Sequence, residues 1–378
     1  MSEVKINSGL EGVVVGETKI SDVDGVGGQL FYRGYDINYL VTRNFIDVSW
    51  MLVFGDWPSS DQHQACNQFL LDNCMLTEEQ NNLLMAMPNN IHPMLVLQSF
   101  VPTLSPSDMD LSNRPSEDED ACLGLFITAK IAALISSVYR KDNNLDRITA
   151  LEGNTINERF FYLFHGRLPS DSEITILDCV QILQMEHGFN AGTFAGRVCS
   201  STKAPISSSI SASIGTLYGV LHGGADEAAL AMAEDIGNLD NVEPYIDKIL
   251  SQGGRVMGMG HREYKVVDPR AKILKPLAMS HCEDDDAESL LNILIRVEEV
   301  CRNRFSEKGK DIWANVEFYK GAVFNSLGIP KKYFTSMFAM SRVYGYVAHF
   351  LEFKKNSRLI RPKALYVGKY INSKSNIE

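Results

Sequence analysis

Three separate segments of the chain carry residue types that could perform acid–base chemistry. LHGGADE contains His222, VMGMGHREYKVVDPR contains His261 and Arg270, and ANVEFY contains Glu317. Imidazole, guanidinium and carboxylate groups are what a proton transfer beside a carbonyl group needs. Together, the three segments predict a site for carbon–carbon bond formation on an acidic small molecule.

His222 lies directly before Gly223 and Gly224, at a break between two stretches of helical periodicity. Backbone N–H groups and the positive end of the following helix disfavour protonation of an imidazole at this point. A neutral imidazole can still donate a hydrogen bond to a carbonyl oxygen. The alternative is a histidine that only caps a turn, and the position by itself leaves both interpretations open.

His261 follows Gly258 and Gly260, which allow a backbone to approach a ligand closely. Arg270 follows in an Asp-Pro-Arg turn, where a rigid guanidinium suits a carboxylate through two hydrogen bonds. The alternative for Arg270 is a surface ion pair with Asp268. The glycines lack the spacing of a complete dinucleotide-binding motif, which argues against that fold.

Glu317 lies near the start of a predicted helix, where an acid is favoured even without a chemical role. In a water-poor cleft, a carboxylate can also remove a proton from carbon if a nearby donor stabilises the enolate. His222 is the candidate donor. Glu317 is therefore a candidate base, and a helix-start acid without a chemical role remains the alternative.

Three further residues are candidates for holding an anionic substrate. Arg342 lies inside the apolar pattern MFAMSRVYGYV, where an unpaired charge is costly, and Arg361 precedes a proline. His187 ends a helical stretch in MEHGFNAGTF. Arg270, Arg342 and His187 together suit a ligand with two carboxylates. For Arg342 and Arg361, a structural ion pair remains the alternative.

A metal site is not predicted. His187, His222, His261 and Glu317 are possible ligands, but none forms a local pair such as His-x-x-x-His, and no cysteine joins them. A Gly-x-Ser-x-Gly motif, which would indicate one type of serine hydrolase, is also missing from the sequence.

The elements that must position these residues are predicted to be mostly helical. Short strands are expected in GVVVGETKIS (12–21) and GQLFYRG (28–34), with Asp36 as the cap of the first helix. Helices are expected over 175–186, 208–220, 225–236, 316–327 and 334–353. The acidic stretch 105–121 is expected to be a solvated loop. The sequence therefore predicts an all-α protein with one small N-terminal β element.

Composition limits the partners. The 378 residues are 45% hydrophobic and 22% charged, and the net charge is −11 with no long basic run. This argues against nucleic acid and anionic membranes as partners. The seven cysteines form no Cys-x-x-Cys pair, which favours a cytoplasmic, reduced protein. The apolar segment 123–138 contains Lys130 and is expected to be a core helix rather than a membrane span.

The chain resembles the citrate synthase family over nearly its whole length. The resemblance rests on GLEGVVVGETKISDVDG, LFYRGYDI, EHGFNAGTFAGRV, LHGGADEAAL, VMGMGHREYKVVDPRAKILK, ANVEFYKGAVFNSLGIP, SRVYGYVAHFLE and RLIRPKALYVG, in that order. It implies a helical fold of two domains. The large domain would comprise residues 1–223 and 329–378 and the small domain residues 224–328, with the active site in the cleft between them.

The resemblance also implies roles for the candidate residues. His222 would stabilise the acetyl-CoA enolate, His261 would polarise the ketone of oxaloacetate, and Glu317 would be the base. His187, Arg270 and Arg342 would bind oxaloacetate, and Arg361 would come from the second subunit of a homodimer. The coenzyme A site would be lined by Val256, Met257, Gly258, Met259, Gly260 and Lys265. The implied enzyme is an acyltransferase of the tricarboxylic acid cycle, which needs no metal or redox cofactor.

The chain departs from the family pattern at several positions. Glu317 stands where the family has aspartate, and its extra methylene displaces the carboxylate by about 1.5 Å. A shift of this size can slow catalysis by on the order of 10²-fold. Gly192 replaces a serine, and Glu186 an aspartate. Glu263 adds an acid near His261, which is expected to raise the pKa of that imidazole.

Two alternatives to citrate synthase remain open. A 2-methylcitrate synthase would use propionyl-CoA, and one methyl group in an apolar pocket changes binding by only about 1–3 kcal/mol. A weakly active or non-catalytic protein that binds coenzyme A or a dicarboxylate is the other alternative, because Glu317 replaces the aspartate.

Overall fold

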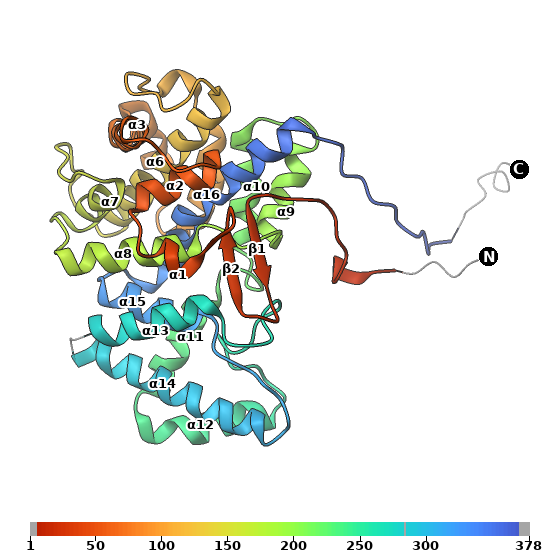
Figure 1. Ribbon diagram of the computed structural model, residues 1–378. Coiled ribbons are helices and arrows are strands. Elements are labelled where there is room, and N and C mark those ends of the chain that lie inside the picture. The colour runs from red at the N-terminus through yellow and green to blue at the C-terminus, as the bar shows by residue number, and fades with distance from the viewer. Residues whose placement is uncertain (1–5, 283–284, 370–378) are drawn as a thin grey trace, which may run out of the picture.

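The computed structural model describes residues 6–282 and 285–369, and most of this part of the chain is helical (Figure 1). The first α-helices are α1 (Ile37–Leu40), α2 (Phe45–Phe54), α3 (Ser60–Asp72), α4 (Glu78–Ala86), α5 (Pro93–Phe100), α6 (Glu119–Asp142), α7 (Ile156–His165) and α8 (Asp171–Gln184). Those that follow are α9 (Ala191–Ser200), α10 (Ile206–Leu217), α11 (Ala225–Ile236), α12 (Val242–Ser251), α13 (Pro269–His281), α14 (Asp285–Ser306), α15 (Val316–Ser326) and α16 (Phe334–Lys355). Short 3-10 turns are η1 (Ser8–Leu10), η2 (Val101–Thr103), η3 (Pro106–Asp108), η4 (Leu239–Asn241) and η5 (Lys331–Tyr333). The predicted fold class is confirmed.

The small β element is an antiparallel sheet in the order β1-β2-β3. Its strands are β1 (Ser21–Asp24), β2 (Gln29–Tyr32) and β3 (Tyr35–Asp36). The prediction of a strand over 12–21 is wrong for all but its last residue, because the pairing begins at Ser21. The valines before it are exposed, and Val14 is 89% accessible. Their strand propensity is not realised because it depends on packing against neighbouring strands.

The hairpin between β1 and β2 packs against the loop that carries His261. Lys265 N–H donates a hydrogen bond to Gly25 O over 2.8 Å. A Cβ atom on Gly25 would come within 2.3 Å of Glu263 O, so only glycine permits this approach. The β element therefore supports one wall of the candidate site.

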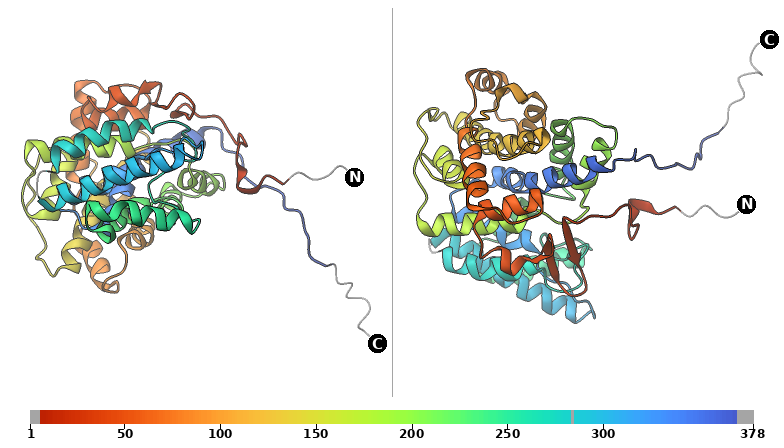
Figure 2. Two further views of the ribbon diagram at one scale, coloured as in Figure 1. Left: turned by 90° about the horizontal axis from the view of Figure 1, so that it is seen from below. Right: turned by 45° about the horizontal axis from the view of Figure 1, so that its top comes forward.

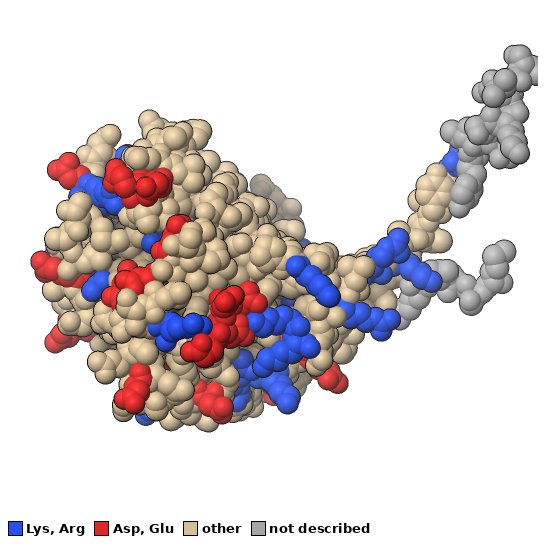
Figure 3. All heavy atoms as spheres, turned by 90° about the horizontal axis from the view of Figure 1, so that it is seen from above, with Lys and Arg blue, Asp and Glu red and all other residues tan. Residues whose placement is uncertain are grey.

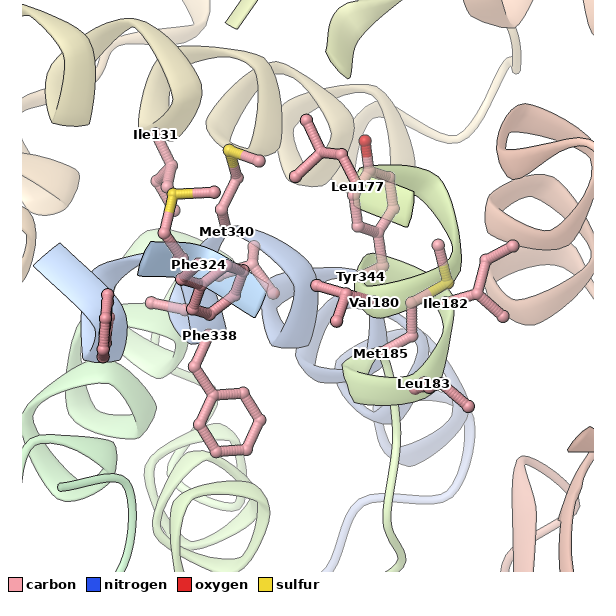
Figure 4. Close-up of a cluster of buried hydrophobic side chains, with 14 of the residues drawn as sticks. Ile131, Leu177, Val180, Ile182, Leu183, Met185, Phe324, Phe338, Met340 and Tyr344 are labelled. Carbon is pink, nitrogen blue, oxygen red and sulfur yellow. The ribbon is translucent and has the colours of Figure 1, made fainter. Parts of the chain in front are cut away.

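Helix α16 is the centre of the larger group of helices and packs against α2, α6, α8, α9 and α10. Figure 4 shows part of this core, to which α6 contributes Ile131, α8 contributes Leu177 and α16 contributes Met340 and Tyr344. Helix α6 is long and apolar enough to cross a membrane, but 89% of its apolar window is buried inside the molecule. This burial agrees with the prediction of a core helix at 123–138.

Helices α11 to α15 pack on one another and lie together on one side of the remaining helices (Figures 1 and 2). Contacts of α1 and α8 with α13, and of α11 with α16, join the two groups. The division into domains at 224–328 remains a prediction, and parts of both predicted domains (1–5, 283–284 and 370–378) lie outside the described residues.

Most predicted helices are present, and their ends follow local capping. The helix predicted over 175–186 begins earlier, at Asp171, because Ser170 and Glu173 form a capping box. The helix predicted over 208–220 ends at Leu217, before the turn that contains His222. The predicted loop 105–121 is interrupted by η3, and α6 already begins at Glu119.

Candidate active site

The glycine-rich segment 256–260 lies against the residues that precede α15. Asn315 N–H donates to Gly258 O over 2.9 Å, and Asn315 Nδ2 donates to Gly260 O over 2.8 Å. Gly258 has φ +77°, and a Cβ atom there would come within 2.7 Å of the Phe318 ring. These contacts fix the backbone of the predicted coenzyme A segment beside the helix that carries the predicted base.

Asp268 connects this helix to Arg270. Its Oδ2 accepts hydrogen bonds from Arg270 Nη2 over 2.8 Å and from Val316 N–H, the first residue of α15, over 3.2 Å. Asn315 caps α15 by accepting Glu317 N–H over 3.0 Å. The predicted base and the predicted carboxylate-binding arginine are therefore held by one hydrogen-bonded unit.

The Glu317 side chain is only 12% exposed and does not extend into bulk solvent. Its Oε2 forms an ion pair with Lys320 Nζ one turn later in α15, and the Lys320 side chain is fully buried. The negative charge of Glu317 acts on both His261 and Arg270. The structure therefore brings these three predicted site residues into one electrostatic cluster.

His261 lies in the loop before α13 and is held by its Nδ1, which accepts Glu263 N–H over 3.0 Å and Tyr264 N–H over 3.2 Å. These two shorter bonds favour the proton of a neutral ring on Nε2 over the longer contact of 3.4 Å between Nε2 and Arg270 Nη2, which can only donate. Burial, with the positive charge of Arg270 adding to it, lowers the pKa of His261 to about 4. The prediction that Glu263 raises this pKa is wrong, because burial and the nearby guanidinium outweigh any effect of Glu263.

His222 lies in the turn between α10 and α11, where its Nε2 is 3.3 Å from Gly192 N and 3.2 Å from Asn190 Oδ1. The N–H of Gly192 can only donate, so when this bond forms the imidazole proton is on Nδ1. The pKa of His222 is lowered to about 4, chiefly by burial and further by the charges of Arg342 and Lys320. The neutral ring agrees with the sequence prediction, although burial is its main cause.

His187 follows α8 and is buried. Its Nε2 lies 3.1 Å from Tyr264 Oη, and the centre of its ring is 5.3 Å from that of His261. Burial and the charge of Arg270 hold its pKa well below the ordinary value. The structure thus brings His187 next to His261, as the candidate substrate site requires.

Arg270 is buried, and its Nε and Nη2 bind Asp268 over 3.1 and 2.8 Å. The pair is internal rather than the surface pair considered from the sequence. Burial opposes the charge of Arg270, but Asp268 outweighs burial and raises its pKa. Because a guanidinium has five N–H groups, Nη1 retains two donors for an anionic ligand.

Arg342 is buried in α16, where its Nε donates to Gln184 O at the end of α8 over 2.7 Å. Its guanidinium carbon lies 4.7 Å from the centre of the Phe338 ring. The positive charge of Arg342 acts on both His187 and His222. Arg342 therefore belongs to the same cluster as the three imidazoles.

Arg361 is the predicted site residue that the structure does not bring to the cluster. It is exposed on the C-terminal segment that leaves the body of the molecule after α16 (Figure 1). Lysine and arginine side chains gather where this segment departs (Figure 3). Within one chain, Arg361 is therefore separated from His261 and Arg270.

A cavity of about 300 Å³ opens beside His261 and is lined by Gly260, His261, Tyr264, Lys265, Val266, Asp268 and residues 311–314. Lys265 is in this wall, and its Nζ donates to Arg262 O over 3.2 Å. The part of the chain that the structure describes contains no cluster of three or more metal-ligating side chains.

Sequence reasoning missed several residues that shape the cluster, namely Tyr264, Asn190, Gln184 and Lys320. The role of Lys320 could have been predicted from the sequence, because a lysine three residues after an acid in an apolar helix indicates an intrahelical ion pair. The backbone and amide contacts of Gln184 and Asn190 could not be predicted from a sequence pattern, because they depend on how α8, α9 and α16 pack.

The fold and the cluster define a class: a helical protein with neutral imidazoles, buried guanidiniums and one sheltered carboxylate, suited to proton transfer on an anionic ligand. A family model described as citrate synthase, C-terminal domain, matches residues 9–363. The chain belongs to the citrate synthase family.

Individual relatives agree with this assignment. The citrate synthase of Saccharolobus solfataricus is 35% identical over 368 residues, which is 96% of each chain. The 2-methylcitrate synthase of Shewanella oneidensis is 33% identical over 374 residues, or 97% of each chain. A ternary complex of Thermoplasma acidophilum citrate synthase with carboxymethyl coenzyme A and oxaloacetate has a TM-score of 0.89 and 29% identity, and the match covers 98% of this chain and 99% of that one.

Proposed function

We propose that this chain is a citrate synthase, which condenses oxaloacetate with acetyl-CoA and water to give citrate and coenzyme A. The observation that carries the proposal is the convergence of neutral His222 and His261 with buried Arg270, Arg342 and sheltered Glu317. The family membership supports it independently.

In the proposed reaction, the Glu317 carboxylate takes a proton from the methyl carbon of acetyl-CoA. The Nδ1–H of His222 donates to the thioester oxygen, on which negative charge develops. A neutral imidazole suits this role because it can donate a hydrogen bond to the developing enolate oxygen without being protonated itself. Glu317 leaves this step protonated, and the enolate carbon becomes the nucleophile.

His261 completes the carbon–carbon bond formation. Its Nε2–H is the donor to the ketone oxygen of oxaloacetate. As the enolate carbon bonds to the carbonyl carbon, the C=O electron pair moves onto this oxygen, which takes the proton of His261 and becomes the hydroxyl of citryl-CoA, and the proton held by Glu317 returns to His261 through solvent. Arg270, Arg342 and His187 hold the substrate and its carboxylates. Water then cleaves the thioester of the citryl-CoA intermediate, releasing citrate and the coenzyme A thiol, and no metal or redox cofactor takes part.

The segment 256–260 and Lys265 are proposed to bind coenzyme A, which is a substrate here. The 300 Å³ cavity beside His261, which Gly260 and Lys265 line, supports this assignment. We further propose a cytoplasmic homodimer in which Arg361 reaches the substrate of the neighbouring subunit. Its exposed position on an extended segment supports that arrangement.

The test is release of coenzyme A thiol by purified protein with oxaloacetate and either acetyl-CoA or propionyl-CoA. We expect the higher kcat/KM with acetyl-CoA and a loss of on the order of 10²–10³-fold in His222→Ala, since a donor to a developing oxyanion is removed. Wild-type turnover no faster than that of the variant would instead indicate a non-catalytic binding protein.

A second candidate is 2-methylcitrate synthase, favoured by the 33% identical relative of that activity. The two substrates differ by one methyl group, worth about 1–3 kcal/mol in an apolar pocket. A clear preference for propionyl-CoA in the same assay would assign this activity in place of the first.

A further inference from the structure

Lys320 is a fully buried lysine in the helix that carries the proposed base. It forms an ion pair with Glu317 Oε2, and its Nζ lies 4.0 Å from the centre of the Phe338 ring in α16. Burying an ammonium group is costly unless opposite charge and aromatic contacts compensate for the loss of water. This cost indicates that Lys320 has a role beyond packing in the core.

Lys320 interacts with both residues of the proposed proton transfer, the base and the hydrogen-bond donor. Its ion pair holds the proposed base, and its positive charge also acts on His222, the proposed hydrogen-bond donor to the thioester. Arg342, stacked against the same Phe338 ring, is the second positive charge that acts on His222. Both cations thus act on the proposed hydrogen-bond donor to the enolate.

We propose that Lys320 is a positioning residue for the reaction, which fixes the carboxylate end of the longer Glu317 side chain through their buried ion pair. The inference rests on the proposed function. Glutamate has one more rotatable bond than aspartate, so its carboxylate needs an additional contact to stay in one place. A cation three residues later in the same helix supplies that contact.

Lys320→Met tests the role because methionine preserves the apolar stem and removes the charge. A carboxylate that loses its counter-ion is harder to ionise. We expect kcat to fall at least about tenfold and the acidic limb of the kcat profile to move up by about one pH unit. The KM for oxaloacetate should change less than about twofold, because Arg270 and Arg342 remain.

Lys332→Met is the matched control. Lys332 also forms an ion pair with a largely buried acid, Asp142, but it lies in η5, outside the cluster. Its loss should leave the pH profile in place. An unshifted profile in Lys320→Met, or a loss confined to KM, would overturn the inference while leaving the citrate synthase proposal intact.

A second measurement does not depend on turnover. In Lys320→Met the Glu317 charge remains buried without its partner, so adding Glu317→Gln should raise the melting temperature above that of the single variant. Equal melting temperatures, or failure of both variants to fold, would overturn the pairing role. If the wild type releases no coenzyme A thiol, the proposed function fails separately, and with it any role of Lys320 beyond the ion pair.

Discussion

The three imidazoles of the cluster are held neutral by burial and by nearby positive charge. A neutral ring donates through one nitrogen and accepts through the other, so a donor bound to one nitrogen identifies the other as the N–H. In His261 two backbone N–H groups occupy Nδ1, and in His222 the N–H of Gly192 is available to Nε2. The donor nitrogen of His261 is therefore Nε2, and that of His222 is Nδ1 when its Nε2 accepts from Gly192 N–H rather than donating to Asn190 Oδ1.

This neutrality predicts a pH dependence of stability. In the unfolded chain His222 and His261 bind a proton below about pH 6.5, whereas in the folded chain they do so only near pH 4. Between these values the unfolded state binds more protons, so the free energy of unfolding rises with pH. We expect it to fall between pH 7 and pH 4.5, by up to about 3 kcal/mol for each imidazole.

Urea unfolding of the wild type and of His261→Asn at several pH values measures this contribution. The variant should lose less stability than the wild type as the pH falls. Unfolding at pH 8, where the rings are neutral in both states, gives the cost of the substitution alone. The same pH dependence in both proteins would show that burial of His261 does not set its protonation.

At the scale of elements, the site depends on how closely α9, α10 and α16 approach. A Cβ atom on Gly192, in the first turn of α9, would meet Tyr346 Oη of α16 at 2.4 Å and Ser213 O of α10 at 3.2 Å. The tyrosine hydroxyl thus fills the space that the serine side chain of the family pattern would need. The same glycine presents its N–H to His222.

Gly192→Ser is therefore expected to destabilise the protein by about 1–3 kcal/mol, as overpacking does, and to lower turnover by displacing the N–H beside His222. Chemical denaturation and the thiol-release assay measure the two effects. Adding Tyr346→Phe removes the nearest clashing atom and should recover most of the stability. If Gly192→Ser alone is as stable as the wild type, the helices are not in such close contact.

How much of this could be predicted from the sequence differs between elements. Helical periodicity and caps placed α11, α15 and α16 nearly to the residue, because local patterns determine those helices. The strand expected over 12–21 failed up to its last residue because sheet formation depends on a partner, which no local pattern supplies. In the site, the residue types in the motifs pointed to His261, Arg270 and Glu317. The pKa of His261 could not be read from Glu263, because burial is a property of the packed molecule.

At the scale of the whole molecule, both terminal segments leave the same side of the body (Figures 1 and 2). They expose apolar side chains, among them Val14 at 89%, Leu359 at 58% and Val367 at 87%. Large exposed apolar surface marks interaction sites. A second copy of the chain that covers these segments is the arrangement that the proposed homodimer requires, and it would bring Arg361 to a neighbouring cluster.

Mixing two inactive variants tests this sharing of sites. In a dimer of Arg361→Ala with His261→Ala, one site combines an intact His261 with the intact Arg361 of its neighbour, and the other site lacks both. Random pairing should therefore restore about a quarter of the wild-type activity. Co-expression followed by the thiol-release assay gives this fraction. A mixture of His222→Ala and His261→Ala is the control and should restore none, because both residues belong to the same chain's site. No recovery in the first mixture would mean that Arg361 acts within its own subunit or not at all, since a residue that crosses the interface must complement in trans.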